Sequence, residues 1–309
     1  MKRTVAMVIG ILFVTASVAM AESNVKGAVI NQSNVKGAAN VAIGQDNTAD
    51  MGKIGIKGSN VKGAVINRSN VKGAANIAIG QGNTATMGST NIKNSNVKGA
   101  VINQSNVESA ANVAIGQGNK AAMGSIDLKN SNVKGAVINQ SNVKNAANVA
   151  IGQGNTATMG SVNMKGSNVK GAVINSSNVQ NAANVAIGQG NKASMGSVNM
   201  KGANVKGAVI NQSNVKNAAN VAIGQGNKAS MGSVNLKNSN IKGAVINRSN
   251  VQGAANVAIG QGNTANMGSV NVKGSNVKGV IYNQSNVEGA ANVAAGKGNK
   301  ANMGSVVIE

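Results

Sequence analysis

The residue types that most often perform chemistry in proteins are scarce in this sequence. The chain has no histidine and no cysteine, so imidazole–metal sites, thiol nucleophiles and histidine general bases are excluded. Its acidic residues do not recur at any position often enough to form a site, and they are Glu22, Asp46, Asp50, Glu108, Asp127, Glu288 and Glu309. Asp46 and Asp50 form one close pair, which we interpret as local surface variation. We therefore expect that the protein is not an enzyme and that it binds neither a cofactor nor a metal ion.

Lysine is the charged residue that does recur. The chain has 29 Lys and Arg residues against 7 Asp and Glu, a net charge of +22. One lysine occurs at a constant step along the whole chain, at Lys26, Lys62, Lys98, Lys134, Lys170, Lys206, Lys242 and Lys278. A row of like charges attracts anionic polymers, so these lysines are candidate binding residues for acidic polysaccharide, lipopolysaccharide or extracellular DNA, without sequence-specific recognition of nucleic acid. The alternative is a solvated face that keeps the protein soluble during export.

The constant step reflects a repeat that fills the chain from Ser23. The fourth copy reads SNVKGAVINQSNVKNAANVAIGQGNTATMGSVNMKG, and the copies follow at a step of 36 residues without insertion or deletion. They span residues 23–58, 59–94, 95–130, 131–166, 167–202, 203–238, 239–274 and 275–309, within a repeat domain of residues 22–309. We name a set of equivalent residues after its first member, such as the Lys26 series. A step that never slips predicts units stacked in register, each burying a face that it cannot bury alone.

The pattern within each copy is that of β-strands. At residues 133–159 the odd positions, including Val149 and Ile151, are mostly apolar or carry amides, and the even positions are mostly polar. Such alternation places one set of side chains on each face of a strand. The phase reverses after Gly160, which predicts a corner there. The chain also lacks proline, as expected where nearly every backbone N–H is needed in a ladder.

We therefore predict an all-β fold, a parallel β-solenoid or cross-β stack of eight 36-residue repeats. One turn per repeat is favoured, because residues half a repeat apart differ in character. Two turns per repeat are the alternative. A solenoid suits a composition with 1% aromatic residues, since its thin core needs only Val, Ile, Ala and Met.

Stacking identical units places each side chain over its own copies, so that amide groups can form ladders. We predict ladders in the Asn31, Asn40 and Asn47 series, whereas Asn24 and Asn34, next to serine, are predicted turn residues. The candidate stacking ladders comprise Asn47, Asn83, Asn119, Asn155, Asn191, Asn227, Asn263 and Asn299, with Met51, Met87, Met123, Met159, Met195, Met231, Met267 and Met303.

The N-terminus has the features of a secretory signal peptide. Lys2 and Arg3 precede an apolar run over residues 5–18, which ends in small residues before Glu22. This run is too short for a membrane span. We expect cleavage after Ala21 and a protein that is secreted, extracellular or at the cell surface.

At Gly152-Gln153-Gly154-Asn155-Thr156-Ala157, and at its equivalents, the sequence resembles secreted functional amyloids of the curlin and Fap type. Those repeats carry a Gly-rich arc, then Asn, one residue and Ala. The resemblance implies a subunit that polymerises with itself into biofilm fibres, with a nucleator subunit and outer-membrane secretion machinery as partners. This chain differs from curlin in its longer unit, few aromatics and many lysines, and from Fap proteins in its unbroken array.

Two other resemblances are weaker. The motif NVAIG at Asn148 to Gly152 is similar to head repeats of trimeric autotransporter adhesins, which also need a coiled-coil stalk and a membrane anchor. The motif TAT at Thr156 to Thr158 resembles ice-binding arrays, but lysine interrupts this series at Lys120 and Lys192. We do not expect either function.

The sequence thus favours a structural subunit of an extracellular amyloid-like fibre. Repeat-like sequence continues close to both ends of the domain, which predicts open edges onto which another copy can add. The alternative is a monomeric basic β-solenoid adhesin that binds anionic polysaccharide, lipopolysaccharide or extracellular DNA.

Overall fold

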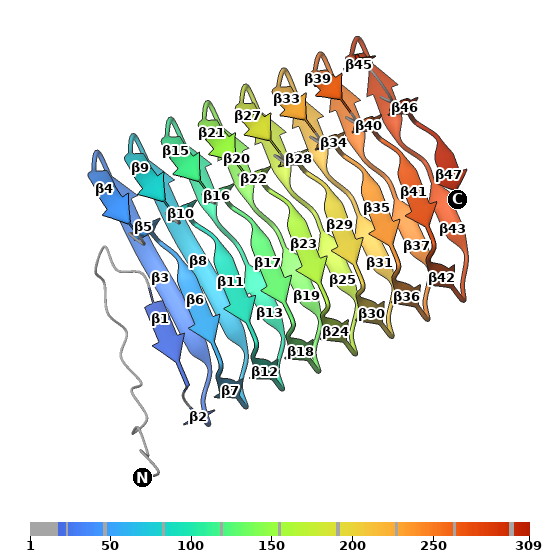
Figure 1. Cartoon of the computed structure of the whole chain (residues 1–309). Coiled ribbons are helices and arrows are strands. Elements are labelled where there is room, and N and C mark those ends of the chain that lie inside the picture. Colours follow the sequence, from blue (N-terminus) through green and yellow to red (C-terminus); the bar gives the residue numbers. More distant parts are fainter. Residues whose placement is uncertain are drawn as a thin grey trace.

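The computed structural model describes residues 18–22, 24–45, 48–81, 84–117, 120–153, 156–189, 192–225, 228–261, 264–296 and 300–309. Within these ranges every regular element is a β-strand and no helix occurs. The strands form a parallel β-solenoid with one turn per 36-residue repeat, which confirms the predicted fold class. Figure 1 shows the turns side by side in chain order, from the blue N-terminal side to the red C-terminal side.

The fourth turn illustrates the order of strands. It contains β18 (Asn132–Val133), β19 (Val137–Asn139), β20 (Asn142–Lys144), β21 (Ala147–Gln153), β22 (Thr156–Met159) and β23 (Val162–Lys165). Strands of other turns lie at multiples of 36 residues from these bounds. In the first two turns the equivalents of β19 and β20 are joined into one strand, β3 (Val29–Lys36) and β8 (Val65–Lys72). In the last turn β45 (Ala291–Ala295) and β47 (Val306–Ile308) are shorter than their equivalents. We call a set of equivalent strands a column, named after its fourth-turn member.

Each column pairs in parallel and in register, so every residue stacks on its equivalent in the next turn. Val137 lies between Val101 and Val173, and all of β21 pairs likewise with β27 (Ala183–Gln189). The β19 and β20 columns share one sheet, and the other four columns form one sheet each. Equivalent side chains are therefore about 4.8 Å apart along the axis, the spacing of neighbouring strands.

Facing columns enclose a thin core of small apolar side chains. Its three parts are built mainly from the Val29, Ile54, Ile56 and Val61 series, the Val35 and Met51 series, and the Ala42 and Ala49 series. Met159 in the second part is fully buried. Because each part continues through all turns, burial depends on having a neighbour on both sides.

Residues with φ angles near +50° to +60° lie at corners of the turns. In the fourth turn these residues are Asn145, Gly160 and Gly166, with φ angles of 49°, 57° and 57°. A Cβ on Gly160 would lie 2.9 Å from the Cβ of Ser177, so this corner has no room for a side chain. The predicted corner after Gly160 is therefore present.

The corner at Asn145 reverses the face that the sequence predicted for β21. Asn148 and Ala150 are fully buried, whereas Ile151 is 36% exposed and Val149 is half-buried. The prediction that Val149 and Ile151 share a face with the other odd positions, such as the buried Val143 and Met159, is wrong. A left-handed residue shifts the alternation by one position, and this moves every following side chain to the other face.

A strand that precedes the repeats extends one sheet at its N-terminal edge. β1 (Val18–Ala21) pairs in parallel with β6 (Ile54–Lys57), with Ala21 opposite Lys57. It therefore takes the place of the last strand of an earlier turn. The predicted cleavage after Ala21 would remove β1 and leave β6 at the edge of its sheet. Residues 1–17, the rest of the predicted signal peptide, lie outside the described residues.

Candidate functional site

An asparagine ladder runs through the inside of the solenoid along the Asn31 series. The Nδ2 of Asn103 donates to the Oδ1 of Asn139 at 3.0 Å, and Asn139 donates to Asn175 at 3.0 Å. The hydroxyl of Ser141 also donates to Asn139, at 2.9 Å. Asn139 is fully buried, so these bonds satisfy amide atoms that have no access to water.

A second buried ladder follows the Asn40 series. The Nδ2 of Asn148 donates to the Oδ1 of Asn184 at 2.8 Å and to the carbonyl of Thr158 at 3.0 Å. This ladder therefore joins neighbouring turns and also ties the β21 column to the β22 column. In both buried ladders the side-chain donors point toward the C-terminal end, which gives the stack a direction.

The Asn24 and Asn34 series form further ladders on the outside. Asn168 donates to Asn132 at 2.9 Å, and Asn142 donates to Asn106 at 2.9 Å. The prediction that these residues make turns is wrong, because they lie in strands, at the first position except for Asn34 within β3 and Asn70 within β8. The left-handed corners fall elsewhere, so the side chains of the outer asparagines are free to stack.

Of the two predicted stacking ladders, the structure describes the methionine ladder. The Met51 series stacks in register from turn to turn, with Met87 beside Met123 and Met159 beside Met195. These methionines are buried except in the last turn, where Met303 is 46% exposed. The predicted Asn47 ladder, from Asn47 to Asn299, lies outside the described residues.

The last turn exposes apolar side chains whose equivalents are buried in the inner turns. Val270, Met267 and Val272 are 0%, 0% and 3% exposed. Their equivalents one turn later are Val306, Met303 and Ile308, which are 45%, 46% and 68% exposed. The difference arises because no described strand pairs with the outer edge of this turn. The edge thus combines apolar side chains with unpaired backbone groups, as in a site for strand addition.

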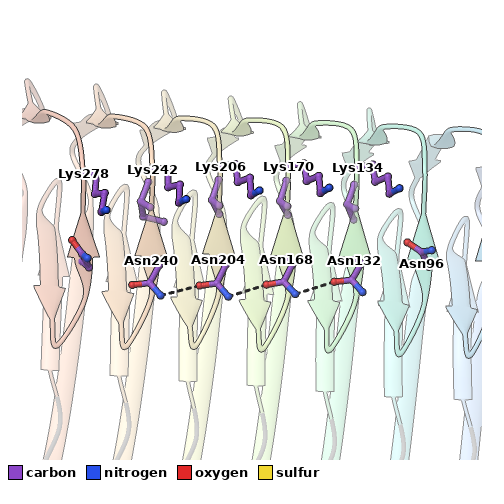
Figure 2. Close-up of a pocket in the computed structure, with 15 residues that line it drawn as sticks. Asn96, Asn132, Lys134, Asn168, Lys170, Asn204, Lys206, Asn240, Lys242 and Lys278 are labelled. Atoms are coloured by element: carbon purple, nitrogen blue, oxygen red, sulfur yellow. Dashed lines mark hydrogen bonds between the residues drawn. The ribbon is translucent and has the colours of Figure 1, made fainter.

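A groove of about 660 Å³ runs along the outside of the stack over the β18 column. Figure 2 shows its two rows of polar side chains, with lysines along one side and asparagines along the other. Its lining residues are Lys134, Lys170, Lys206, Lys242 and Lys278, Asn96, Asn132, Asn168, Asn204, Asn240 and Asn276, and Val133, Val169, Val205 and Ile241. We call it the lysine–asparagine groove.

The groove contains most of the predicted polyanion-binding lysines. Five members of the Lys26 series line it, whereas Lys26, Lys62 and Lys98 are exposed in the earlier turns of the same series. The asparagines were not predicted to belong to this site. Each asparagine precedes a lysine by two residues, and this spacing could have indicated the site, because residues i and i+2 of an extended segment lie on one face.

Two other lysines are partly buried in neighbouring turns, at the first position of β28 (Lys192–Met195) and β34 (Lys228–Met231). Burial lowers the pKa of Lys192 to about 8, and the opposing field of Asp127 offsets part of this shift. Burial also lowers the pKa of Lys228 to about 7, assisted by the positive charges of Lys192 and Lys237. The sequence shows that these lysines replace a threonine of other copies, but it does not show that they are buried.

The described residues contain no cluster of acidic side chains that could hold a metal ion. No helix in the described ranges is long and apolar enough to cross a bilayer. Comparison with protein-family models, with curated proteins and with solved structures found no match for the chain. The two candidate sites are therefore the open edge and the lysine–asparagine groove.

Proposed function

We propose that this protein is a secreted structural subunit that assembles end to end into amyloid-like fibres of a bacterial biofilm matrix or surface. The exposed last turn carries the proposal. Val306, Met303 and Ile308 occupy positions that every inner turn buries under its neighbour. A second copy that stacks there would cover them, and each side chain would contribute about 1–3 kcal/mol when fully buried.

The first turn of a second copy has the register needed for this contact. Ile54 is equivalent to Val306, and Asn31 is equivalent to Asn283. Asn283 accepts a bond from Asn247 at 3.1 Å. An incoming Asn31 would extend the ladder in the same direction, and the strands of both copies would continue the same parallel sheets. Such a contact joins two different faces, so it leads to an open filament rather than a closed dimer.

The sequence adds support for the location and the partners. The predicted signal peptide favours export, and the resemblance to curlin and Fap repeats favours a fibre with a nucleator and outer-membrane secretion machinery. Pairing of identical side chains along the stack is the arrangement that makes cross-β fibres stable.

The experiment changes the open edge alone. In the double variant V306K/I308K, an added copy would have to bury two unpaired ammonium groups, which is strongly unfavourable. Both side chains are exposed in the single chain, so folding should be retained. We expect filament growth, followed by turbidity and electron microscopy, to be lost or slowed at least about tenfold, the effect of roughly 1.4 kcal/mol on an equilibrium.

The matched control is I79K/I259K. It adds the same charge on exposed outer positions away from the ends, where Ile79 and Ile259 are 37% and 41% exposed. This control should form filaments. Growth of V306K/I308K at the rate of the unmodified protein would overturn the proposed end-to-end assembly.

A further inference from the structure

We propose that the lysine–asparagine groove binds one chain of a linear acidic polysaccharide, extended along the axis of the solenoid. Uronate carboxylates would pair with the lysine row, and sugar hydroxyls would bond to the asparagine row. The proposal concerns the side of the stack and not its ends, so it holds for a monomer and for a fibre.

The charge of the groove is unbalanced. Five lysines line it, and none of the described residues in its lining is acidic. The ion pairs between described residues use Lys53, Lys72, Lys120, Lys273 and Lys300, none of which lies in the groove. Neighbouring ammonium groups in the row therefore repel one another. An anionic polymer that follows the row relieves this repulsion at every turn and releases its own counterions.

The asparagine row supplies neutral hydrogen-bonding groups beside the charges. Asn204 donates to Asn168 at 2.9 Å, and Asn240 donates to Asn204 at 3.1 Å. An amide nitrogen carries two N–H groups and an amide oxygen has two lone pairs. The ladder uses one of each, so a second donor and a second acceptor remain per turn. Hydroxyl groups, which both donate and accept, match this pair.

The repeat distance of the groove suits a sugar chain. One lysine and one asparagine occur per turn, at the strand spacing of about 4.8 Å. A pyranose ring in an extended chain is about as long as this spacing, so each uronate residue can face one turn. Between the two rows lie Val133, Val169, Val205 and Ile241, whose side chains are buried in the core, so the floor of the groove is the strand backbone.

Nucleic acid fits the groove less well. Single strands bind by stacking bases on aromatic side chains, with help from arginine, and the lining contains neither aromatic residues nor arginine. Phosphates along one strand of a duplex wind around the helix axis with a rise of about 3.4 Å per nucleotide, which does not match a straight row of charges about 4.8 Å apart. The observations therefore favour the polysaccharide.

Binding of fluorescent polygalacturonate oligomers tests the proposal. The groove variant K134Q/K170Q/K206Q/K242Q is compared with K129Q/K165Q/K201Q/K237Q, which removes four exposed lysines outside the lining. We expect the groove variant to lose roughly tenfold or more in affinity and to show a smaller salt dependence. The control variant should lose about twofold at most, because its lysines lie outside the groove and contribute only a long-range attraction, and neutral dextran should not bind.

A second variant separates the two rows. N132A/N168A/N204A should weaken polygalacturonate binding while the slope of affinity against salt stays unchanged, because no charge is removed. All binding is also measured on V306K/I308K, so that a failure of filament assembly is distinguished from a failure of the groove. Equal losses in the two lysine variants, or tighter binding of single-stranded DNA than of polygalacturonate, would overturn the proposal.

Discussion

Buried amide groups are what distinguish this core from an ordinary apolar one. Asn139 and Asn148 are fully buried, and each bonds to its equivalents and to a neighbouring serine or backbone carbonyl. A buried amide without hydrogen-bond partners lowers the free energy of unfolding. When all its polar atoms are bonded, it helps to specify a single packing arrangement. Because one-residue slips would break these ladders, they fix the register of the stack.

The ladders predict a difference between inner and outer asparagines. N139A removes the acceptor of the Asn103 and Ser141 side chains, which would remain buried without that partner. We expect the free energy of unfolding to fall by roughly 1–3 kcal/mol. N142A removes an outer ladder member that is half-buried, and its effect should stay below about 1 kcal/mol. Denaturant unfolding of both variants checks this, and equal losses would contradict it.

The partly buried lysines predict how stability depends on pH. The pKa of Lys192 is about 8 and that of Lys228 about 7 in the folded protein, both below the ordinary value of 10.5. Between about pH 7 and 9.5 the unfolded chain therefore binds more protons than the folded chain. The free energy of unfolding should rise with pH across this window, because deprotonation removes the cost of burying the charge.

Replacement of these lysines tests the cause. K192T/K228T introduces the residue found at the equivalent positions Thr156 and Thr264. We expect a gain of roughly 1–3 kcal/mol at pH 7 and a flatter pH profile. The exposed pair K134T/K170T serves as the control and should leave the profile unchanged. A wild-type profile that is flat or falls from pH 7 to 9.5 would contradict the assignment.

At the scale of strands, the sequence was sufficient for the period, the parallel pairing and the corner after Gly160. These follow from a constant step and from alternation, both of which are visible in the residues. It was not sufficient for the face of β21, because the left-handed corner at position 145 and its equivalents is occupied by Asn, Gly or Ser. Asn is common both in strands of this chain and in turns, so its type alone did not show which it makes.

The candidate site could likewise be predicted from the sequence only in part. The lysine row was visible as a series, but the neighbouring asparagine row was assigned to turns and therefore missed. The burial of Lys192 and Lys228 was also missed, since burial depends on how the turns pack and not on the residue type at one position. Such long-range packing leaves no local signal in a single repeat.

Strand β1 leads to a prediction about processing. It lies on β6, in the place that the last strand of another copy would take in the proposed fibre. A chain that begins at Glu22 should therefore assemble with a shorter lag than a chain that begins at Val18. Turbidity and electron microscopy at equal concentration compare the two. Equal lag times would show that β1 does not block the edge.

At the scale of the whole molecule, the solenoid is a short segment of a structure that could continue. Its turns have one register, its buried ladders have one direction, and its last turn exposes the positions that inner turns bury. The lysine rows oppose close lateral packing of such segments and favour growth along the axis, especially at low salt where screening is weak. These features together favour thin filaments over amorphous aggregates.

The most direct test is electron microscopy with fibre diffraction on residues 22–309, released from denaturant at moderate salt. We predict unbranched filaments with a meridional reflection near 4.7–4.8 Å, the spacing of strands along the axis. Persistent monomeric rods under these conditions, verified by sedimentation, would contradict the proposed assembly.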